Sequence, residues 1–279
     1  ADAVATGILL APLDTDLRVA SSVMRSIDPA RIEAAIEIIK ATQSGMSTEQ
    51  FSGIVAEWLE TAKDPRFGRV YTDLVYQPML ELLEYLRAND FKIFIVSGTG
   101  ADFIRVFAEK TYRIPPEQVV GSTSVAEFTV GEAGPVLMKT AEVEVLNDGP
   151  GKPEAIDRFI GRRPIFAFGN SDGDKEMLEW TAAGPGVRFV GLLHHTDAER
   201  EWAYDRDLKV GRLDKALELA RAKDWTIVDM AADAGGNVDI TRPDLHATSD
   251  SAFMDETRQY GRLVKRPQIE GLSLRPDVV

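Results

Sequence analysis

The sequence lacks cysteine altogether. This absence excludes disulfides, thiolate metal sites and cysteine nucleophiles, so catalysis would have to use oxygen and nitrogen groups. Long apolar runs are also lacking, because stretches such as 91–96 and 187–193 are far shorter than a bilayer span of about 20 residues. We therefore expect a soluble protein with no membrane partner. An initiator Met is missing too, which leaves room for a removed signal peptide and leaves a cytoplasmic or periplasmic compartment undecided.

Basic residues are fewer than acidic ones: the chain has 32 Lys and Arg against 45 Asp and Glu, and its net charge is −13. A surface of this charge repels nucleic acid, which we exclude as a partner. A small phosphorylated substrate is not excluded, because a local cation or a helix N-terminus is enough to bind it. The length of 279 residues with 44% hydrophobic content suits one α/β core with a cap. Composition does not indicate the oligomeric state.

Helical periodicity dominates the first part of the chain. Asp28 and Pro29 start a predicted helix that ends at Gly45, and a capping-box pattern of Ser47 and Gln50 starts another. From Pro78 onwards, helices alternate with short apolar runs, which indicates a parallel sheet. The chain is therefore divided into an N-terminal strand or arm (1–20), a helical cap (21–75), an α/β core (76–230) and an irregular tail (231–279).

The core is predicted to have a Rossmann-like parallel sheet with a small β-hairpin insert around Gly131 and Gly134. Predicted strands cover 91–96, 119–125, 164–168, 187–193 and 225–228. Predicted helices cover 78–88, 101–112, 153–160, 175–182, 198–203 and 213–223. Ligands of such sheets bind at the carboxyl ends of the strands.

The first polar strand end is Ser97-Gly98-Thr99-Gly100, directly before a predicted helix. It offers a hydroxyl and backbone N–H groups to an anion, although an ordinary turn with glycine would have the same sequence. A dinucleotide fingerprint is excluded because Phe103 takes the place of its third glycine.

The second polar strand end carries Asn170, Asp172 and Asp174. An EF-hand is excluded, since Lys175 replaces its glycine and Thr181 its last glutamate. A solvated acidic turn is one interpretation. We favour a Mg²⁺ site, because oxygen groups crowded at one strand end repel each other unless a cation or a lysine compensates.

Lys152 supplies a lysine at the start of the preceding helix. The order of Ser97-Gly98, Lys152 and the stretch 169–174 resembles motifs two, three and four of the haloacid dehalogenase (HAD) superfamily, over about residues 41–230. Within this span, residues 76–83 and 194–202 resemble a bacterial phosphoserine-phosphatase-like subgroup.

The resemblance implies a Rossmann-like core with a helical cap and phosphomonoester hydrolysis through an aspartyl-phosphate. Ser97 and Gly98 would bind the phosphoryl group and Lys152 would neutralise it. Asn170 would bind Mg²⁺ directly or through water, Asp174 would hold that shell and Lys152, and Asp172 is a further candidate ligand. His194 and His195 follow a strand, and we assign neither a catalytic role.

The first motif of the superfamily has its best candidate in Asp14 and Asp16. Asp14 would be the nucleophile and a metal ligand; Asp16 would be the general acid and base and would offer its carbonyl to the metal. Pro12 and the Leu17-Arg18 pair depart from the motif, so these aspartates could instead belong to a surface arm. In that case the chain would be a pseudo-enzyme that binds metal or phosphate. A carbon–halogen or phosphonate hydrolase is a third alternative, which Lys152 and the carboxylate cluster disfavour.

Overall fold

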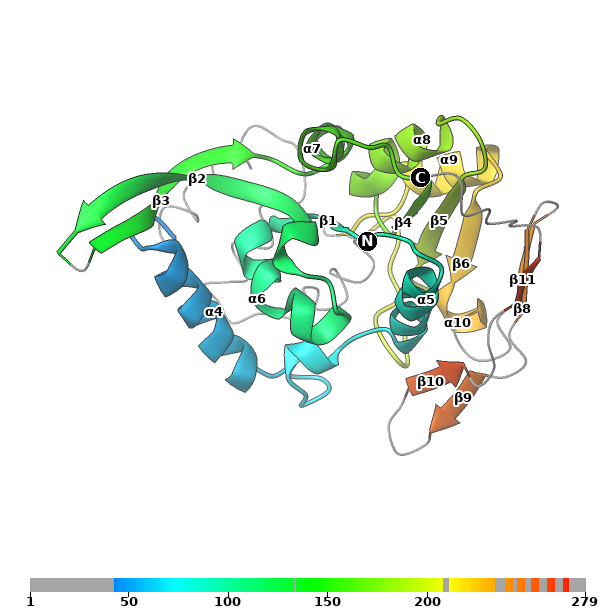
Figure 1. Cartoon of the computed structure of the whole chain (residues 1–279). Coiled ribbons are helices and arrows are strands. Elements are labelled where there is room, and N and C mark those ends of the chain that lie inside the picture. Colours follow the sequence, from blue (N-terminus) through cyan, green and yellow to red (C-terminus); the bar gives the residue numbers. More distant parts are fainter. Residues whose placement is uncertain are drawn as a thin grey trace.

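The computed structural model describes residues 43–132, 134–207 and 211–233, and the backbone of five short strands between 239 and 270 (Figure 1). Asp14, Asp16 and the helix predicted from Asp28 lie outside the described residues. None of the described helices is long and apolar enough to cross a membrane.

One sheet contains the first polar strand end. Strand β1 (Ile95–Gly100) leads into helix α6 (Ala101–Tyr112) and pairs in parallel with β2 (Val119–Gly131), which pairs with antiparallel β3 (Gly134–Val145). The predicted hairpin is therefore present, but it continues β2 rather than forming a separate insert (Figure 1). Strand β1 begins at Ile95 instead of residue 91, because its partner strand begins opposite, at Val119.

The other sheet contains the second polar strand end. Strands β4 (Phe166–Gly169), β5 (Phe189–His194) and β6 (Thr226–Asp229) are all parallel. Helices α8 (Lys175–Ala182) and α9 (Lys215–Ala222) connect them. This is the predicted βαβ alternation, and it confirms the parallel α/β core.

The two sheets share one hydrophobic core. Val96 and Val120 of the first sheet pack in the same cluster as Ala167 and Val190 of the second. Helix α7 (Gly151–Ile160) lies between them in the chain, and its Ile156 is fully buried in this cluster. The carboxyl ends of β1 and β4 are thereby brought to one region of the molecule.

Helix α4 (Thr48–Thr61) is the described part of the predicted cap. Its capping box is formed as predicted, with the Gln50 N–H 3.1 Å from Ser47 Oγ and the Ser47 N–H 2.8 Å from Gln50 Oε1. Phe51 and Val55 on its buried face belong to the same core cluster as Phe103 of α6. This helix is therefore anchored to α6, and the assignment of residues 21–75 to a cap stays a prediction.

The remaining elements join or follow these sheets. Helix α5 (Gln77–Ala88) ends before Asn89, as predicted. Short helices are η1 (Tyr71–Asp73), η2 (Pro116–Gln118), η3 (Asp172–Asp174) and α10 (Met230–Asp233). Where the pattern predicts an irregular tail, the structure has β7 (Asp239–Arg242), β8 (Leu245–Thr248), β9 (Ala252–Asp255), β10 (Tyr260–Leu263) and β11 (Gln268–Glu270). Each has three or four residues, too few for a period to appear in the sequence.

The helix predicted at 198–203 is wrong, because this segment forms a turn. The Asp197 carboxylate accepts the backbone N–H groups of Glu199 at 3.0 Å and Arg200 at 2.8 Å, as an N-cap does, but only a single turn follows. The chain then returns, and the Tyr204 N–H donates to the His195 carbonyl at 2.9 Å.

Candidate active site

Ser97 and Gly98 lie within the last residues of β1, not in a free turn. The Ser97 side chain is buried, and its Oγ accepts the N–H of Thr99 at 3.2 Å. Two buried residues absent from the sequence-based site hold this backbone. Asn147 Nδ2 donates to the Ser97 carbonyl at 2.8 Å, and Ser122 Oγ donates to the Gly98 carbonyl at 2.8 Å. The strand end is thus fixed from β2 and from the segment after β3.

Lys152 connects the two sheets from the first turn of α7. Its side chain is fully buried, and Nζ donates to Asp174 Oδ1 at 2.7 Å and to the Val96 carbonyl in β1 at 3.3 Å. Burial lowers the pKa of Lys152, while the charge and hydrogen bond of Asp174 act in the opposite direction. An anion beside this ammonium group would favour its protonated form further.

Asp174 organises the turn after β4. Its Oδ2 accepts the N–H groups of Asn170 at 2.8 Å and Ser171 at 3.1 Å, while Oδ1 faces Lys152. Glycine is required at 169, because a Cβ there would lie 2.6 Å from the Asp174 Cβ. The structure therefore brings Lys152 and Asp174 together.

Asn170 is fully buried beside Asp174, and its two amide ends have different surroundings. Nδ2 lies 3.1 Å from His195 Nε2. Oδ1 is buried and has no hydrogen-bond partner among the described residues. A buried oxygen without a partner is costly in a folded protein unless an unseen group satisfies it. A hard cation is one such group.

Asp172 faces another way. Its Oδ1 accepts the N–H groups of Asp214 and Ala216, both at 2.9 Å, at the start of α9. This contact satisfies backbone groups of the helix N-terminus. A metal-ligand role for Asp172 stays a prediction, and it would use the other carboxylate oxygen, Oδ2.

No cluster of three or more His, Asp or Glu side chains suited to a metal is found in the part of the chain that the structure describes. The predicted Mg²⁺ set does not require one there. Of its five residues, Asn170, Asp172 and Asp174 are described and include only two carboxylates, while Asp14 and Asp16 lie outside the described residues.

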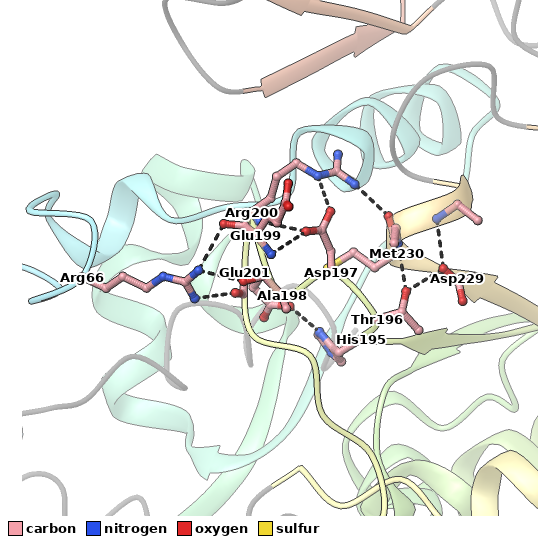
Figure 2. A network of polar contacts seen from close by, with 12 residues as sticks. Arg66, His195, Thr196, Asp197, Ala198, Glu199, Arg200, Glu201, Asp229 and Met230 are labelled. Carbon is pink, nitrogen blue, oxygen red and sulfur yellow. Dashed lines mark hydrogen bonds and ion pairs between the residues drawn. The ribbon is translucent and has the colours of Figure 1, made fainter.

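A chain of buried polar contacts leads away from Asn170. His195 Nδ1 lies 2.8 Å from Glu201 Oε2, and the Tyr76 hydroxyl donates to Glu201 Oε1 at 2.6 Å. The His195 ring stacks on Tyr204 with centroids 4.3 Å apart. Figure 2 shows His195 and Glu201 within a larger polar network that also includes Arg66, Asp197 and Arg200. Sequence reasoning left His195 without a role, because nothing local indicates that it reaches Asn170.

A model of the haloacid dehalogenase-like hydrolase family matches residues 4–179. The chain belongs to this family. The match confirms the predicted superfamily and the hydrolase class. It begins before Asp14 and Asp16, and it also spans Ser97, Lys152, Asn170 and Asp174.

Solved structures similar to this HAD-like chain share little sequence with it. A phosphoserine phosphohydrolase-like protein from Francisella tularensis is 18% identical, over 78% of this chain and 84% of that one, with a TM-score of 0.38. A cytosolic 5′-nucleotidase IIIB bound to cytidine is 16% identical, over 67% of this chain and 63% of that one, with a TM-score of 0.39. A search of curated proteins gives no match.

Proposed function

We propose that this chain is a Mg²⁺-dependent phosphatase that hydrolyses a small phosphomonoester through an aspartyl-phosphate intermediate. The observation that carries the proposal is the buried Lys152–Asp174 pair at 2.7 Å, which links Val96 of β1 to the turn after β4, beside Ser97 and Asn170. A buried ammonium group at the carboxyl ends of parallel strands is suited to a phosphoryl group.

The phosphoryl group would be held by residues at both strand ends. The Ser97 hydroxyl and the backbone of Gly98 would bind its oxygens, and Lys152 would offset the charge that they carry. Asn147 and Ser122 would keep Ser97 and Gly98 in place during the reaction, because they hold the carbonyls of both residues.

The chain's residues fit Mg²⁺, since Asn170 presents a buried amide oxygen without a partner in the described residues. With Asn170, the carboxylate of Asp14 and the carbonyl of Asp16 would hold the ion, and Asp174 would keep the turn in shape. Asp172 remains a further candidate. The ion would supply positive charge to the phosphoryl oxygens.

We propose Asp14 as the nucleophile. Its carboxylate would form a bond to phosphorus as the ester oxygen leaves, and Asp16 would give that oxygen a proton. Asp16 would then remove a proton from the water that attacks phosphorus, which releases phosphate and restores Asp14. The family match supports this assignment because it begins at residue 4.

The test is hydrolysis of 4-nitrophenyl phosphate by the full chain with Mg²⁺, with and without a chelator. Asp14→Asn should lower the rate by at least about 1,000-fold, because it removes the attacking group. The exposed Asp224→Asn change, which also removes one carboxylate, should leave the rate unchanged. Absence of turnover in the folded wild type, with stabilisation by Mg²⁺ or phosphate, would replace this proposal with the binding-protein alternative.

A further inference from the structure

The amide of Asn170 has two ends, and only one of them can bind a cation. An aspartate at this position would present equivalent oxygens, whichever way its side chain turned. An asparagine presents either an oxygen or an NH₂ group, and the NH₂ group repels a metal ion. A chain with Asn170 therefore needs something that decides the orientation of the amide.

The hydrogen bonds of the residues around Asn170 set the orientation of its amide. Burial and the negative charge of Glu201 raise the pKa of Tyr76, so its hydroxyl keeps its proton and donates to Glu201 Oε1. The second carboxylate oxygen of Glu201 lies 2.8 Å from His195 Nδ1. A carboxylate can only accept a hydrogen bond, so Nδ1 of His195 carries a proton and donates to Glu201, and in this tautomer Nε2 carries none.

The other ring nitrogen of His195 is then an acceptor. Nε2 lies 3.1 Å from Asn170 Nδ2, so the amide NH₂ group donates to it. Oδ1 consequently points to the other side, where it is buried without a partner in the described residues. If the proton were on Nε2 instead, the amide would reverse and its NH₂ group would face the proposed metal.

The segment that carries Glu201 is fixed by contacts with Arg66, which keep the Glu201 carboxylate beside His195. Arg66, on the loop after α4, donates to the carbonyls of Ala198 at 2.8 Å and Glu199 at 3.1 Å (Figure 2). Its guanidinium also lies over the Trp202 ring, 4.5 Å from the centroid. The Glu201 side chain is 15% exposed, and the His195 side chain is fully buried.

We propose that Glu201 and His195 are positioning residues that hold the Asn170 amide with its oxygen toward the Mg²⁺ site. The inference rests on the proposed function for the identity of the metal. The hydrogen-bond pattern itself can be tested without metal or turnover. Outer contacts of this kind typically change metal affinity by about 10- to 100-fold.

The first measurement is the tautomer of His195 in the metal-free full chain, read from long-range ¹H–¹⁵N NMR correlations. His195→Phe assigns the signal, and the Phe ring can keep the stacking on Tyr204. We expect the tautomer with the proton on Nδ1, in which Nε2 accepts the Asn170 amide N–H. A proton on Nε2 would overturn the inference and would leave the phosphatase proposal standing.

The second measurement is Mg²⁺ affinity by calorimetry in a double-mutant cycle. His195→Phe should weaken Mg²⁺ binding by about 10- to 100-fold in the Asn170 chain. The same change in an Asn170→Asp background should alter the affinity less than about threefold, because both oxygens of a carboxylate can bind the metal ion. His194→Phe is the matched control, since the adjacent His194 ring faces Asp205, with Nε2 3.7 Å from Asp205 Oδ2, and it should not change the affinity.

Equal weakening in both backgrounds would show a general structural role and would overturn the inference. Near-UV circular dichroism shows whether His195→Phe damages the fold. If the fold is intact, recovery of Mg²⁺ affinity in the Asn170→Asp background shows that the variant had lost the orientation of the Asn170 amide. Failure of the folded wild type to bind Mg²⁺ at millimolar concentration, with the proton found on Nδ1, would count against the proposed metal and hence against the proposed function.

Discussion

At the scale of single residues, the buried charge of Lys152 depends on the carboxylate of Asp174. It is fully buried, and Asp174, also fully buried, is its carboxylate partner. Two buried charges stabilise a fold only as a pair, because either one alone would be left desolvated without compensation. The pair can therefore serve catalysis only while both members are present.

Lys152→Met should lower the free energy of unfolding by about 3 kcal/mol, because it leaves the Asp174 carboxylate buried and unpaired. Urea unfolding at neutral pH measures the change. Lys139→Met is the control: Lys139 is also buried, but its partner Asp102 is 29% exposed, so water can solvate the remaining charge. Lys139→Met should therefore lower the free energy of unfolding by less than Lys152→Met does. A smaller cost for Lys152→Met than for the control would contradict this account of the pair.

The same two variants separate stability from catalysis. Lys152→Met should abolish metal-dependent phosphate ester hydrolysis at temperatures where it remains folded, because no other described lysine bridges β1 and Asp174. Lys139→Met should retain the activity, since its ammonium pairs with Asp102 of α6. Comparable hydrolysis by both variants would show that Lys152 serves the fold alone.

At the scale of elements, the segment from His195 to Tyr204 is a turn stabilised by one carboxylate. Burial alone would raise the pKa of Asp197, but the hydrogen bonds and charge of Arg200 and the N–H of Glu199 lower it overall. Arg200 also donates to the Met230 carbonyl at 2.9 Å, so the turn is tied to the first residue of α10, directly after β6. Asp197 thereby helps to place Glu201 and His195.

The lowered pKa of Asp197 predicts a stability that depends on acid. The folded value lies below the ordinary 3.8, so the ionised carboxylate stabilises the fold above that pH, and the contribution disappears as pH falls through the folded value. Asp197→Asn should therefore cost about 1–2 kcal/mol at pH 7 and progressively less below pH 4. Urea unfolding at several pH values tests this, with Asp224→Asn as control. A cost that does not change with pH would exclude an ionic role for Asp197.

At the scale of the whole molecule, the site depends on two sheets that share one core. Each strand end supplies part of the site, and α7 brings Lys152 to both. A ligand that binds the folded arrangement alone must stabilise the entire chain by mass action. Binding should therefore be visible as a change in thermal stability, even without turnover.

Mg²⁺ together with inorganic phosphate should raise the Tm of the wild type by about 5–10 °C at roughly 100 times their dissociation constants, which corresponds to about 2.7 kcal/mol. A chelator should reverse the shift, and Lys152→Met should show much less of it. Differential scanning calorimetry measures the effect. An unchanged Tm at millimolar ligand would argue against a metal and phosphate site.

The sequence alone determined most elements of the core and the order of the candidate site. The capping box at Ser47, the helices from Pro78 and Ala101 and the parallel strands around Phe168 and Val190 all follow from local periods and local caps. Lys152, at the start of a helix, could be selected only from its place in the order of the superfamily's motifs, between the two polar strand ends. The periods and the caps depend on neighbours a few residues away.

The tertiary structure decided which polar atoms meet. Asp172 directs one oxygen to the start of α9, 42 residues away, and Asn147 holds Ser97 across 50 residues. His195 reaches Asn170 because β4 and β5 are paired in parallel, which places the residues after both strands side by side. Strand register and side-chain direction arise from packing between distant segments, and no local period in the sequence encodes them.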